Sequence, residues 1–368
     1  MKSHFLIFPF LFFLLPFTSL HGQGNQAQEA GKMFIENKRV FVVKPLVGIG
    51  CFDLSNPKRP RELAFIKMEG VVDIYVRASF LFASRYEWLT VAKFSLEDLT
   101  IEHLANSSKE AFPDREASNS WNPSLKIFPS YEQFLAKEKK IQSLGFSRAQ
   151  GSMSCITMKG DYLYAINGEG LLSFRARITD LPVEFISGQP VPEVETIWEQ
   201  GEYLYMGTKR GMFIYSLEDR SKPLYESFVP HIRARDPVVV QGDYAYVTTR
   251  AEQGIRRSRN ELIINNVADV SNPFQVKRIP LSQPRGLSVK GKSLAVCEGT
   301  DGIRFFLLTD PGTPKEVAHF SFPNEELLVY EVIHHPKLPI AIVSTDVCWI
   351  VYDLSQIAAP KELTRFTL

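Results

Sequence analysis

Six charged residues lie about six positions before copies of a motif that recurs along the chain. They are Asp73, Glu195, Arg235, Asp236, Arg285 and Glu331. Paired carboxylates can perform general acid–base chemistry or hold a metal ion, whereas mixed charges favour a polar ligand or ion pairs among themselves. All of these roles require the fold to bring together residues that are far apart in the sequence.

The recurring motif reads Gly-acid-aromatic-apolar-aromatic. Its clear copies begin at Gly160, Gly201 and Gly242, 41 residues apart, and its weaker copies begin at Asn37, Ala78, Gly291 and Pro336. A later strand in each repeat ends in Asp and usually a Pro-containing turn, as in CFDLSNPKRP from Cys51. Asp and Ser bond to nearby backbone and Pro restricts φ, so this second element indicates turn chemistry rather than catalysis.

Each repeat reads as four short strands in about 41 residues, the size of one propeller blade. Seven repeats can be counted, and no long helical pattern separates them. One such sheet cannot bury both faces, so neighbouring repeats must stack and the array must close or be capped. We predict an all-β protein, a β-propeller of seven four-stranded blades, with six or eight as alternatives. A sandwich would explain the alternation but not the spacing.

The propeller gives the six charged residues a common place. The innermost strand of each blade lines the channel, and the loop that enters this strand lies at the channel mouth. We therefore predict that these residues form a polar, ligand-binding rim. The alternative is that they are ordinary loop side chains surrounded by water.

Several stretches resemble the LVIVD-repeat family of β-propeller proteins. The likeness is clearest in residues 160–182, 242–273 and 53–57, through GDYAYV and DVSNP, and it covers most of residues 32–364. It implies a propeller in exported or cell-surface bacterial proteins, but it supplies no catalytic residue or ligand. The first strand (KMFIE) and the last (ELTRF) fall in different blades, so we expect no shared closing blade.

Residues 1–23 have the pattern of a signal peptide. Lys2 precedes an apolar run from Phe5 to Leu20, which is shorter than the roughly 20 residues that a membrane span needs. We predict export to the periplasm, the outer surface or the medium, with residues 24–368 forming a single propeller domain. An uncleaved membrane anchor is the alternative.

Two segments interrupt the repeat. Residues 100–140 are polar and contain Pro, so we predict an excursion from blade two, with a degenerate eighth blade as the alternative. Residues 250–261 include Arg256, Arg257 and Arg259, and we expect a basic hairpin extension on blade five.

Composition and motifs argue against several function classes. The 368 residues contain 42 Lys and Arg against 41 Asp and Glu, which gives no electrostatic preference for nucleic acid or anionic membrane. Phosphate-binding loops, zinc-protease motifs and EF-hand loops are absent from the sequence. His334 and His335 are adjacent in a predicted strand and must point to opposite faces. We therefore predict no cofactor and no bound metal.

Four cysteines occur singly in predicted strands, at Cys51, Cys155, Cys297 and Cys348. We expect them to be buried thiols that pack as small apolar side chains. Cys51 and Cys348 form the pair most suited to a disulfide, because both could lie where the ring closes.

Together these features favour an exported, non-enzymatic protein that binds a protein, a cell-envelope component or another extracellular ligand through loops at the channel mouth. One alternative is a propeller hydrolase or lyase that uses carboxylates at the rim, with or without a metal. Another is a structural scaffold in the cell envelope. The sequence does not indicate the oligomeric state.

Overall fold

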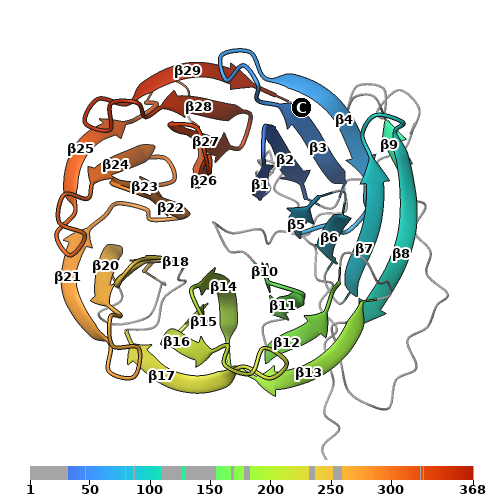
Figure 1. The fold of residues 1–368 in the computed structure, drawn as a ribbon. Helices are drawn as coiled ribbons and strands as arrows, with labels where there is room; N and C mark the ends of the chain where they lie inside the picture. The colour runs from blue at the N-terminus through green and yellow to red at the C-terminus, as the bar shows by residue number, and fades with distance from the viewer. Residues whose placement is uncertain are drawn as a thin grey trace, which may run out of the picture.

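Seven antiparallel sheets form a ring around a central channel (Figure 1). This computed structural model describes residues 32–45, 47–78, 80–85, 88–108, 126–128, 155–166, 170–177, 183–231, 237–251, 259–323, 325 and 327–367. Within those residues each sheet consists of four strands in sequence order, and blade one has a fifth strand. The predicted β-propeller with seven four-stranded blades is therefore confirmed.

The innermost strands of blades one to seven line the channel. They are β1 (Met33–Glu36), β5 (Asp73–Arg77), β10 (Ile156–Lys159), β14 (Val194–Gln200), β18 (Val238–Gln241), β22 (Leu287–Lys290) and β26 (Val329–His334). The repeated motif opens with a turn, and the second strand of each blade follows this turn. They are β2 (Arg39–Lys44), β6 (Phe80–Arg85), β11 (Tyr162–Ile166), β15 (Tyr203–Thr208), β19 (Tyr244–Thr249), β23 (Ser293–Cys297) and β27 (Ile340–Thr345).

The third and fourth strands complete each blade toward the outside. The third strands are β3 (Gly48–Asp53), β7 (Trp88–Ser95), β12 (Gly170–Arg175), β16 (Gly211–Ser216), β20 (Glu261–Asn266), β24 (Ile303–Leu307) and β28 (Trp349–Asp353). The outermost strands are β4 (Arg61–Lys67), β8 (Thr100–Ser108), β13 (Glu184–Pro190), β17 (Leu224–Pro230), β21 (Phe274–Pro280), β25 (Lys315–Phe320) and β29 (Lys361–Phe366).

The repeated glycine serves the hairpin between the first and second strands. In six blades the first turn residue has a positive φ between 54° and 60°, as a type II′ turn requires. Glycine adopts this conformation without steric cost, and four of the six turns use it at positions 160, 201, 242 and 291. The motif is therefore a requirement of the hairpin.

At this end of the channel, the last residue of an innermost strand reaches the hairpin turn of the next blade. Glu36 accepts the N–H of Ala78 (2.5 Å), and Gln200 Nε2 donates to the carbonyl of Gly242 (2.9 Å). The equivalent contacts for three further blades run from Arg77 to Gly160, from Gln241 to Gly291 and from Lys290 to His335. Lys159 pairs with Glu202 at 3.6 Å. These contacts, which we call the latch ring, link six successive pairs of blades.

Apolar side chains hold neighbouring blades together. One buried cluster lies between each pair of adjacent blades, so that seven clusters complete the ring. Tyr164 belongs to the cluster between blades three and four, and its hydroxyl donates to the carbonyl of Arg220 in blade four (2.9 Å). The aromatic residues of the motif are therefore structural.

The Asp-containing turns also have a structural role. Asp53 Oδ1 accepts the N–H of Ser55 (2.8 Å), and the N–H groups of Ser221 and Ser355 donate in the same way to Asp219 and Asp353. Hydrogen bonds from the hydroxyl and the backbone N–H of each serine lower the pKa of each of the three carboxyl groups. The repeated Asp thus stabilises the turn before the outermost strand, as the sequence predicts.

In the part of the chain that the structure describes, the ring closes between blades seven and one without a shared blade. The closing cluster includes Val40, Phe52, Ile342 and Phe366, with the Phe52 and Phe366 ring centroids 4.8 Å apart. The first and last strands belong to different sheets. Side-chain packing, rather than strand exchange, therefore closes the propeller.

Every outermost strand carries an irregularity. The register between the third and fourth strands shifts once in each of the seven blades. A bulge twists an edge strand and makes it a poorer template for further strand addition. Only blade one carries an added strand in the described residues: β9 (Lys126–Phe128) pairs with residues 65–67 of β4, beyond the shift.

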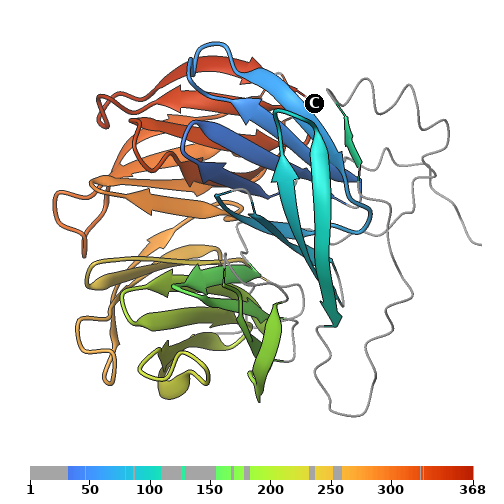
Figure 2. The ribbon, with the colours of Figure 1, turned by 45° about the vertical axis from the view of Figure 1, so that its right-hand side comes forward.

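The segment 100–140 differs from its expected description. Residues 100–108 form β8, the outermost strand of blade two, and the excursion begins after them. The sequence hides this strand because outermost strands here are largely exposed and do not need apolar alternation. β9 lies beside β8 on the outside of the ring, on blade one rather than blade two (Figure 2). Residues 109–125 and 129–140 lie outside the described residues.

Candidate functional site at the channel mouth

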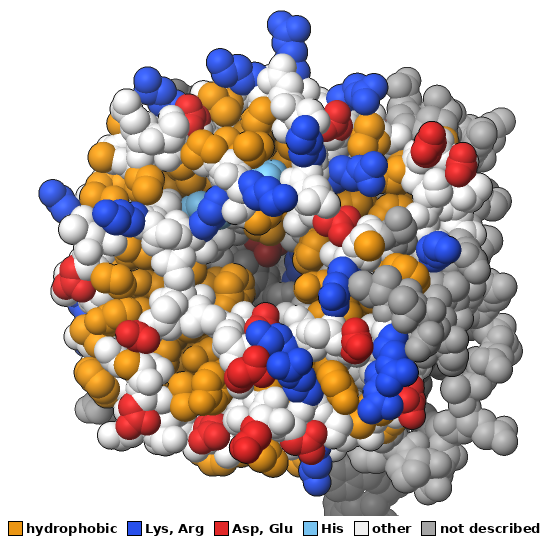
Figure 3. Space-filling view, in the orientation of Figure 1, with side chains coloured by type: hydrophobic (Ala, Val, Ile, Leu, Met, Phe, Trp, Pro, Cys, Tyr) orange, Lys and Arg blue, Asp and Glu red, His pale blue; other side chains and the backbone are white. Residues whose placement is uncertain are grey.

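Four of the six predicted residues lie where the innermost strands begin, at the end of the channel opposite the latch ring. Asp73 is the first residue of β5, Glu195 lies in β14, Glu331 lies in β26, and Arg285 precedes β22. Arg235 and Asp236 lie outside the described residues. Figure 3 shows a hollow at the centre of the ring with acidic and basic side chains around it.

Lys32 and Asp73 form an ion pair between blades one and two. Lys32 Nζ lies 3.1 Å from Asp73 Oδ2, and the two side chains are 11% and 4% exposed. Asp73 also accepts the N–H of Ile74 at Oδ1 (2.8 Å) and the N–H of Cys155 at Oδ2 (2.5 Å). One carboxylate therefore links blades one, two and three.

Glu331 brings a second carboxyl group from blade seven. Burial raises its pKa to about 8; Lys32 opposes this shift and the Asp73 carboxylate adds to it. Burial alone would lower the pKa of Lys32, but Asp73, Cys155 and Glu331 together raise it. Near neutral pH, Glu331 is thus largely protonated, beside the Lys32–Asp73 ion pair. We call Lys32, Asp73, Cys155 and Glu331 the mouth cluster.

Cys155 completes the mouth cluster, with its Sγ 3.4 Å from Lys32 Nζ. All four cysteines are free thiols. Cys51 packs between blades one and two, whereas Cys348 packs between blades six and seven. The suggested Cys51–Cys348 disulfide is therefore wrong, because ring closure places the two residues in different blade interfaces.

Glu195 and Arg285 occupy other blades at the same end. Glu195 is half-buried, at the point where the register between β14 and β15 shifts. The Arg285 guanidinium lies over the Tyr330 ring, 4.9 Å from its centroid. The structure thus places Asp73 in contact with Lys32 and Glu331 within the electrostatic reach of both, and it places Arg285 against the residue next to Glu331.

The sequence prediction missed two members of the mouth cluster, Lys32 and Cys155. Both stand five residues before the repeated motif, the same offset as Asp73 and Glu331. Lys32 precedes the first blade, and Cys155 follows a segment without repeat character, so the sequence around them does not mark either as a strand start. The equal offset was the signal that could have found them.

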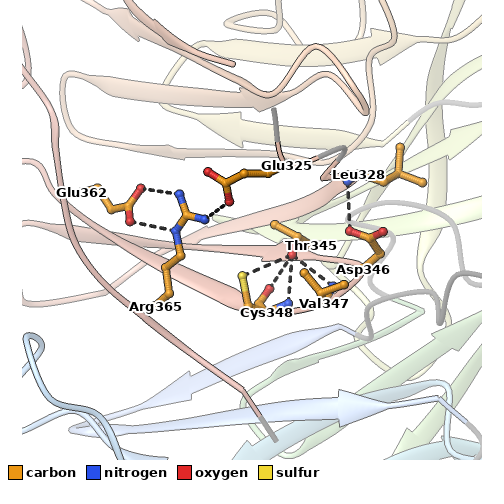
Figure 4. Close-up of polar contacts among 8 residues, drawn as sticks. All are labelled: Glu325, Leu328, Thr345, Asp346, Val347, Cys348, Glu362 and Arg365. Carbon is orange, nitrogen blue, oxygen red and sulfur yellow. Dashed lines mark hydrogen bonds and ion pairs between the residues drawn. The ribbon is translucent and has the colours of Figure 1, made fainter. Parts of the chain in front are cut away.

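The connection into blade seven is anchored by polar contacts around β27 and β28 (Figure 4). Arg365 donates to Glu362 through two nitrogens (2.8 and 3.1 Å) and pairs with Glu325. Asp346 accepts the N–H of Leu328 (3.0 Å), and the Thr345 hydroxyl donates to the carbonyl of Cys348 (2.9 Å). These contacts fix the chain immediately before Val329 and Glu331.

One group in the described residues has the donor atoms for a metal ion. The ligand atoms of Glu298, Asp301 and His319 lie within 4.8 Å of one another in blade six. However, Arg304 pairs with the buried Glu298 and with Asp301 (3.4 Å) and Glu316 (3.2 Å). The arginine already supplies the positive charge that a metal would bring, so we assign this group a structural role.

His334 and His335 are both buried and serve the blade interface. The His334 ring lies between the Ser288 and Ser293 hydroxyls, at 2.9 and 3.0 Å. Burial lowers the pKa of His334 to about 3 and also lowers that of His335. His335 Nδ1 accepts two backbone N–H groups of its own turn. The two histidines thus make separate contacts, His334 with blade six and His335 within the turn that follows β26.

Comparison with solved structures supports the propeller fold. The chain is similar to a functionally unknown protein from Desulfotomaculum acetoxidans, with 13% identity, a TM-score of 0.59, and coverage of 89% of this chain and 99% of that one. A protein assigned as a candidate 6-phosphogluconolactonase from Bacteroides uniformis has 12% identity, a TM-score of 0.57, and coverage of 77% and 83%. Hsv2 from Kluyveromyces lactis has 8% identity, a TM-score of 0.56, and coverage of 90% and 95%.

At these identities the likeness extends to the fold alone. No family model matches the chain, and no curated protein matches it. Membership of the LVIVD-repeat family therefore stays a prediction. The described part of the chain contains no helix that is long and apolar enough to cross a membrane.

Proposed function

We propose that this protein is an exported, non-enzymatic propeller of the LVIVD-repeat type that binds a ligand at the channel mouth. The observation that carries the proposal is the mouth cluster. Lys32, Asp73 and Glu331 come from three blades, are largely shielded from water, and occupy one repeat position whose residue type changes from blade to blade. The latch ring uses repeating positions to join blades, so residues that depart from the repeat are the candidates for a specific role.

The hydrogen bonds of Asp73 favour binding over acid–base catalysis. Its Oδ1 accepts one backbone N–H, and its Oδ2 accepts a second and contacts the Lys32 ammonium. A general base needs a lone pair within reach of the substrate proton. Asp73 is therefore better suited to hold Lys32 in place than to accept a proton. Among the charged members of the mouth cluster, this leaves Lys32 and Glu331 as the groups that can meet a ligand.

Glu331 supports a second candidate function, acid catalysis in a hydrolase or lyase. A carboxyl group with a pKa of about 8 carries a proton at neutral pH and can give it to a leaving group. In this alternative Glu331 is the acid and Lys32 orients the substrate. The predicted reaction would be lost in a Glu331→Gln variant that still binds the same molecule.

The test is capture of the ligand from extracts of the source organism. The purified chain is incubated with envelope and small-molecule extracts, and retained molecules are identified by mass spectrometry. We expect at least one molecule or protein to be retained by the natural chain and lost from Glu331→Gln. Asp219→Asn, which changes an exposed turn, is the matched control. Retention that is equal on all three proteins, or absent from all three, contradicts the proposal.

The same capture separates the two candidate functions. Each retained molecule is incubated with the natural chain, and its conversion is followed over time. A molecule that is retained unchanged supports the binding protein. Conversion that depends on Glu331 supports the enzyme and overturns the non-enzymatic assignment.

Export is a part of the proposal that rests on the sequence pattern of residues 1–23. It predicts that the mature chain begins shortly after Gln23. N-terminal sequencing of the protein recovered from the cell envelope or medium checks this. A chain found in the cytoplasm with Met1 intact contradicts export.

A further inference from the structure

We propose that Arg285 receives an anionic group, a carboxylate or a phosphate, of the ligand bound at the channel mouth. This inference rests on the proposed function and names the ligand class for that site. It follows from the position of Arg285, from the partners of its guanidinium and from the charges around it.

The backbone of Arg285 is held on both sides. Its N–H donates to the carbonyl of Cys297 (2.8 Å), and its carbonyl accepts the Thr248 hydroxyl (2.7 Å). The next residue, Gly286, donates its N–H to the carbonyl of Tyr330 (2.9 Å). These bonds join blades five, six and seven at the point where β22 begins. Arg285 therefore projects from a rigid part of the mouth.

The side chain is positioned but has no anionic partner among the described residues. The guanidinium lies over the Tyr330 ring, and Nε is shielded from water without a hydrogen-bond acceptor. Stacking on an aromatic face orients an arginine and leaves the in-plane N–H groups available. A shielded polar group without a partner is unfavourable, so an incoming acceptor would relieve this cost.

Other arginines of the described chain show what Arg285 lacks. Arg304 contacts three carboxylates, and Arg365 contacts two. Glu298, which lies close to the Arg285 loop and accepts the N–H of Ser282 (2.6 Å), is already paired with Arg304. The nearby buried carboxylate is therefore committed elsewhere.

Gly299 provides the space for this arrangement. A Cβ at this position would lie 3.1 Å from Arg285 Nε and 2.8 Å from Gln283 Oε1. Its φ of +57° also favours glycine. The turn of blade six thus lets the arginine side chain lie flat against the backbone instead of pointing into the solvent.

Among the described residues of the mouth, the surrounding charges leave Arg285 without a carboxylate partner. Lys32 is neutralised by Asp73, and the raised pKa of Glu331 leaves that group largely uncharged near pH 7. Glu195 lies on blade four and has interactions of its own. A guanidinium presents paired N–H groups that match the oxygens of a carboxylate or phosphate. This match defines the ligand class.

The test uses inorganic phosphate and citrate as separate probes, so that the phosphate and carboxylate sources are distinguished. Binding is measured by isothermal titration in chloride buffer for the natural chain, Arg285→Gln, Arg285→Lys and Arg59→Gln. Arg59 lies in an exposed turn of blade one and serves as the matched loss of one charge. We expect at least one probe to bind with an affinity that falls about tenfold or more in Arg285→Gln.

Arg285→Lys should lose part of this affinity, because an ammonium lacks the paired geometry, and Arg59→Gln should bind like the natural chain. If neither probe binds the natural chain, or if all variants bind equally, the inference is overturned. A captured ligand that is neutral or cationic and is retained by Arg285→Gln overturns it while leaving the proposed function intact. If no ligand is captured but a probe anion binds in a way that depends on Arg285, the proposed function is contradicted and the inference about Arg285 stands.

Discussion

At one end of the channel, the last residue of an innermost strand bonds to the hairpin turn of the next blade, and this contact recurs for six successive pairs of blades. At the other end, Lys32, Asp73 and Glu331 come from blades one, two and seven and meet once. Arg285 lies at the same end, against Tyr330. The first end is built from what the repeats share, and the second from what single blades add.

This difference separates two demands on a propeller. A blade is stable only beside another blade, so contacts that join blades must recur around the ring. A binding site needs different groups at defined places, so it must break the repeat. We therefore expect substitutions in the latch ring to change stability alone, and substitutions at the mouth to change both stability and binding.

The largest effect is expected for Asp73→Ala. This change removes the partner of a buried lysine and an acceptor for two backbone N–H groups, so it should lower the free energy of unfolding by about 3–5 kcal/mol. Urea denaturation measures the change. Asp353→Ala, in an exposed turn, should cost less than about 1 kcal/mol.

A double variant tests the reason for this loss. If the unpaired ammonium causes it, Lys32→Met should restore part of the stability of Asp73→Ala, because the buried charge is then absent. Equal stability of the single and double variants would show that the lost backbone acceptor dominates.

The next effect is a pH dependence that belongs to Glu331. Its folded pKa of about 8 exceeds its usual value of 4.5, so the folded protein keeps a proton that the unfolded chain releases between those pH values. The stability contributed by this group is full below about pH 4.5 and is lost as pH rises through 8, by at most about 1.4 kcal/mol per pH unit.

Glu331→Gln should remove that dependence. The free energy of unfolding of the variant should rise relative to that of the natural chain from pH 5 to pH 8, as measured by urea denaturation at several pH values. Lys32 remains charged across this range and does not mask the effect. Parallel pH profiles for the two proteins would contradict the assignment.

The smallest effect is expected in the latch ring. Gln241→Ala removes two hydrogen bonds to the backbone of Gly291, at 2.7 and 2.6 Å, in an exposed position. It should lower the free energy of unfolding by about 1 kcal/mol and leave ligand affinity unchanged. A loss of affinity without a loss of stability would show that this end also takes part in binding.

The sequence predicts the architecture well because the same strand and turn signals recur in each blade. The glycine, the two aromatic residues and the Asp turn each satisfy a local requirement of hairpin, interface or turn, so that spacing alone leads to the blade. Residues 100–108 escaped this reasoning because an exposed outermost strand is defined by backbone pairing with β7 rather than by apolar alternation.

The candidate site is less predictable, because its residues differ from blade to blade and meet only in the closed ring. Asp73 and Glu331 could be placed at one end of the channel by counting from the motif, but their meeting depends on ring closure between blades seven and one. Lys32 has no repeat before it, and the partners of Arg285 arise from three blades. Burial and pairing, which set the pKa of Glu331, become visible only once the ring is formed.

The most direct test compares the two ends for the same ligand. The captured ligand is titrated into the natural chain, Gln241→Ala, Glu331→Gln and Arg285→Gln, each shown to be folded at the measuring temperature. The account predicts that affinity falls about tenfold or more for both mouth variants and stays within about twofold for Gln241→Ala. Equal affinities for all four proteins, or a selective loss in Gln241→Ala, would contradict it.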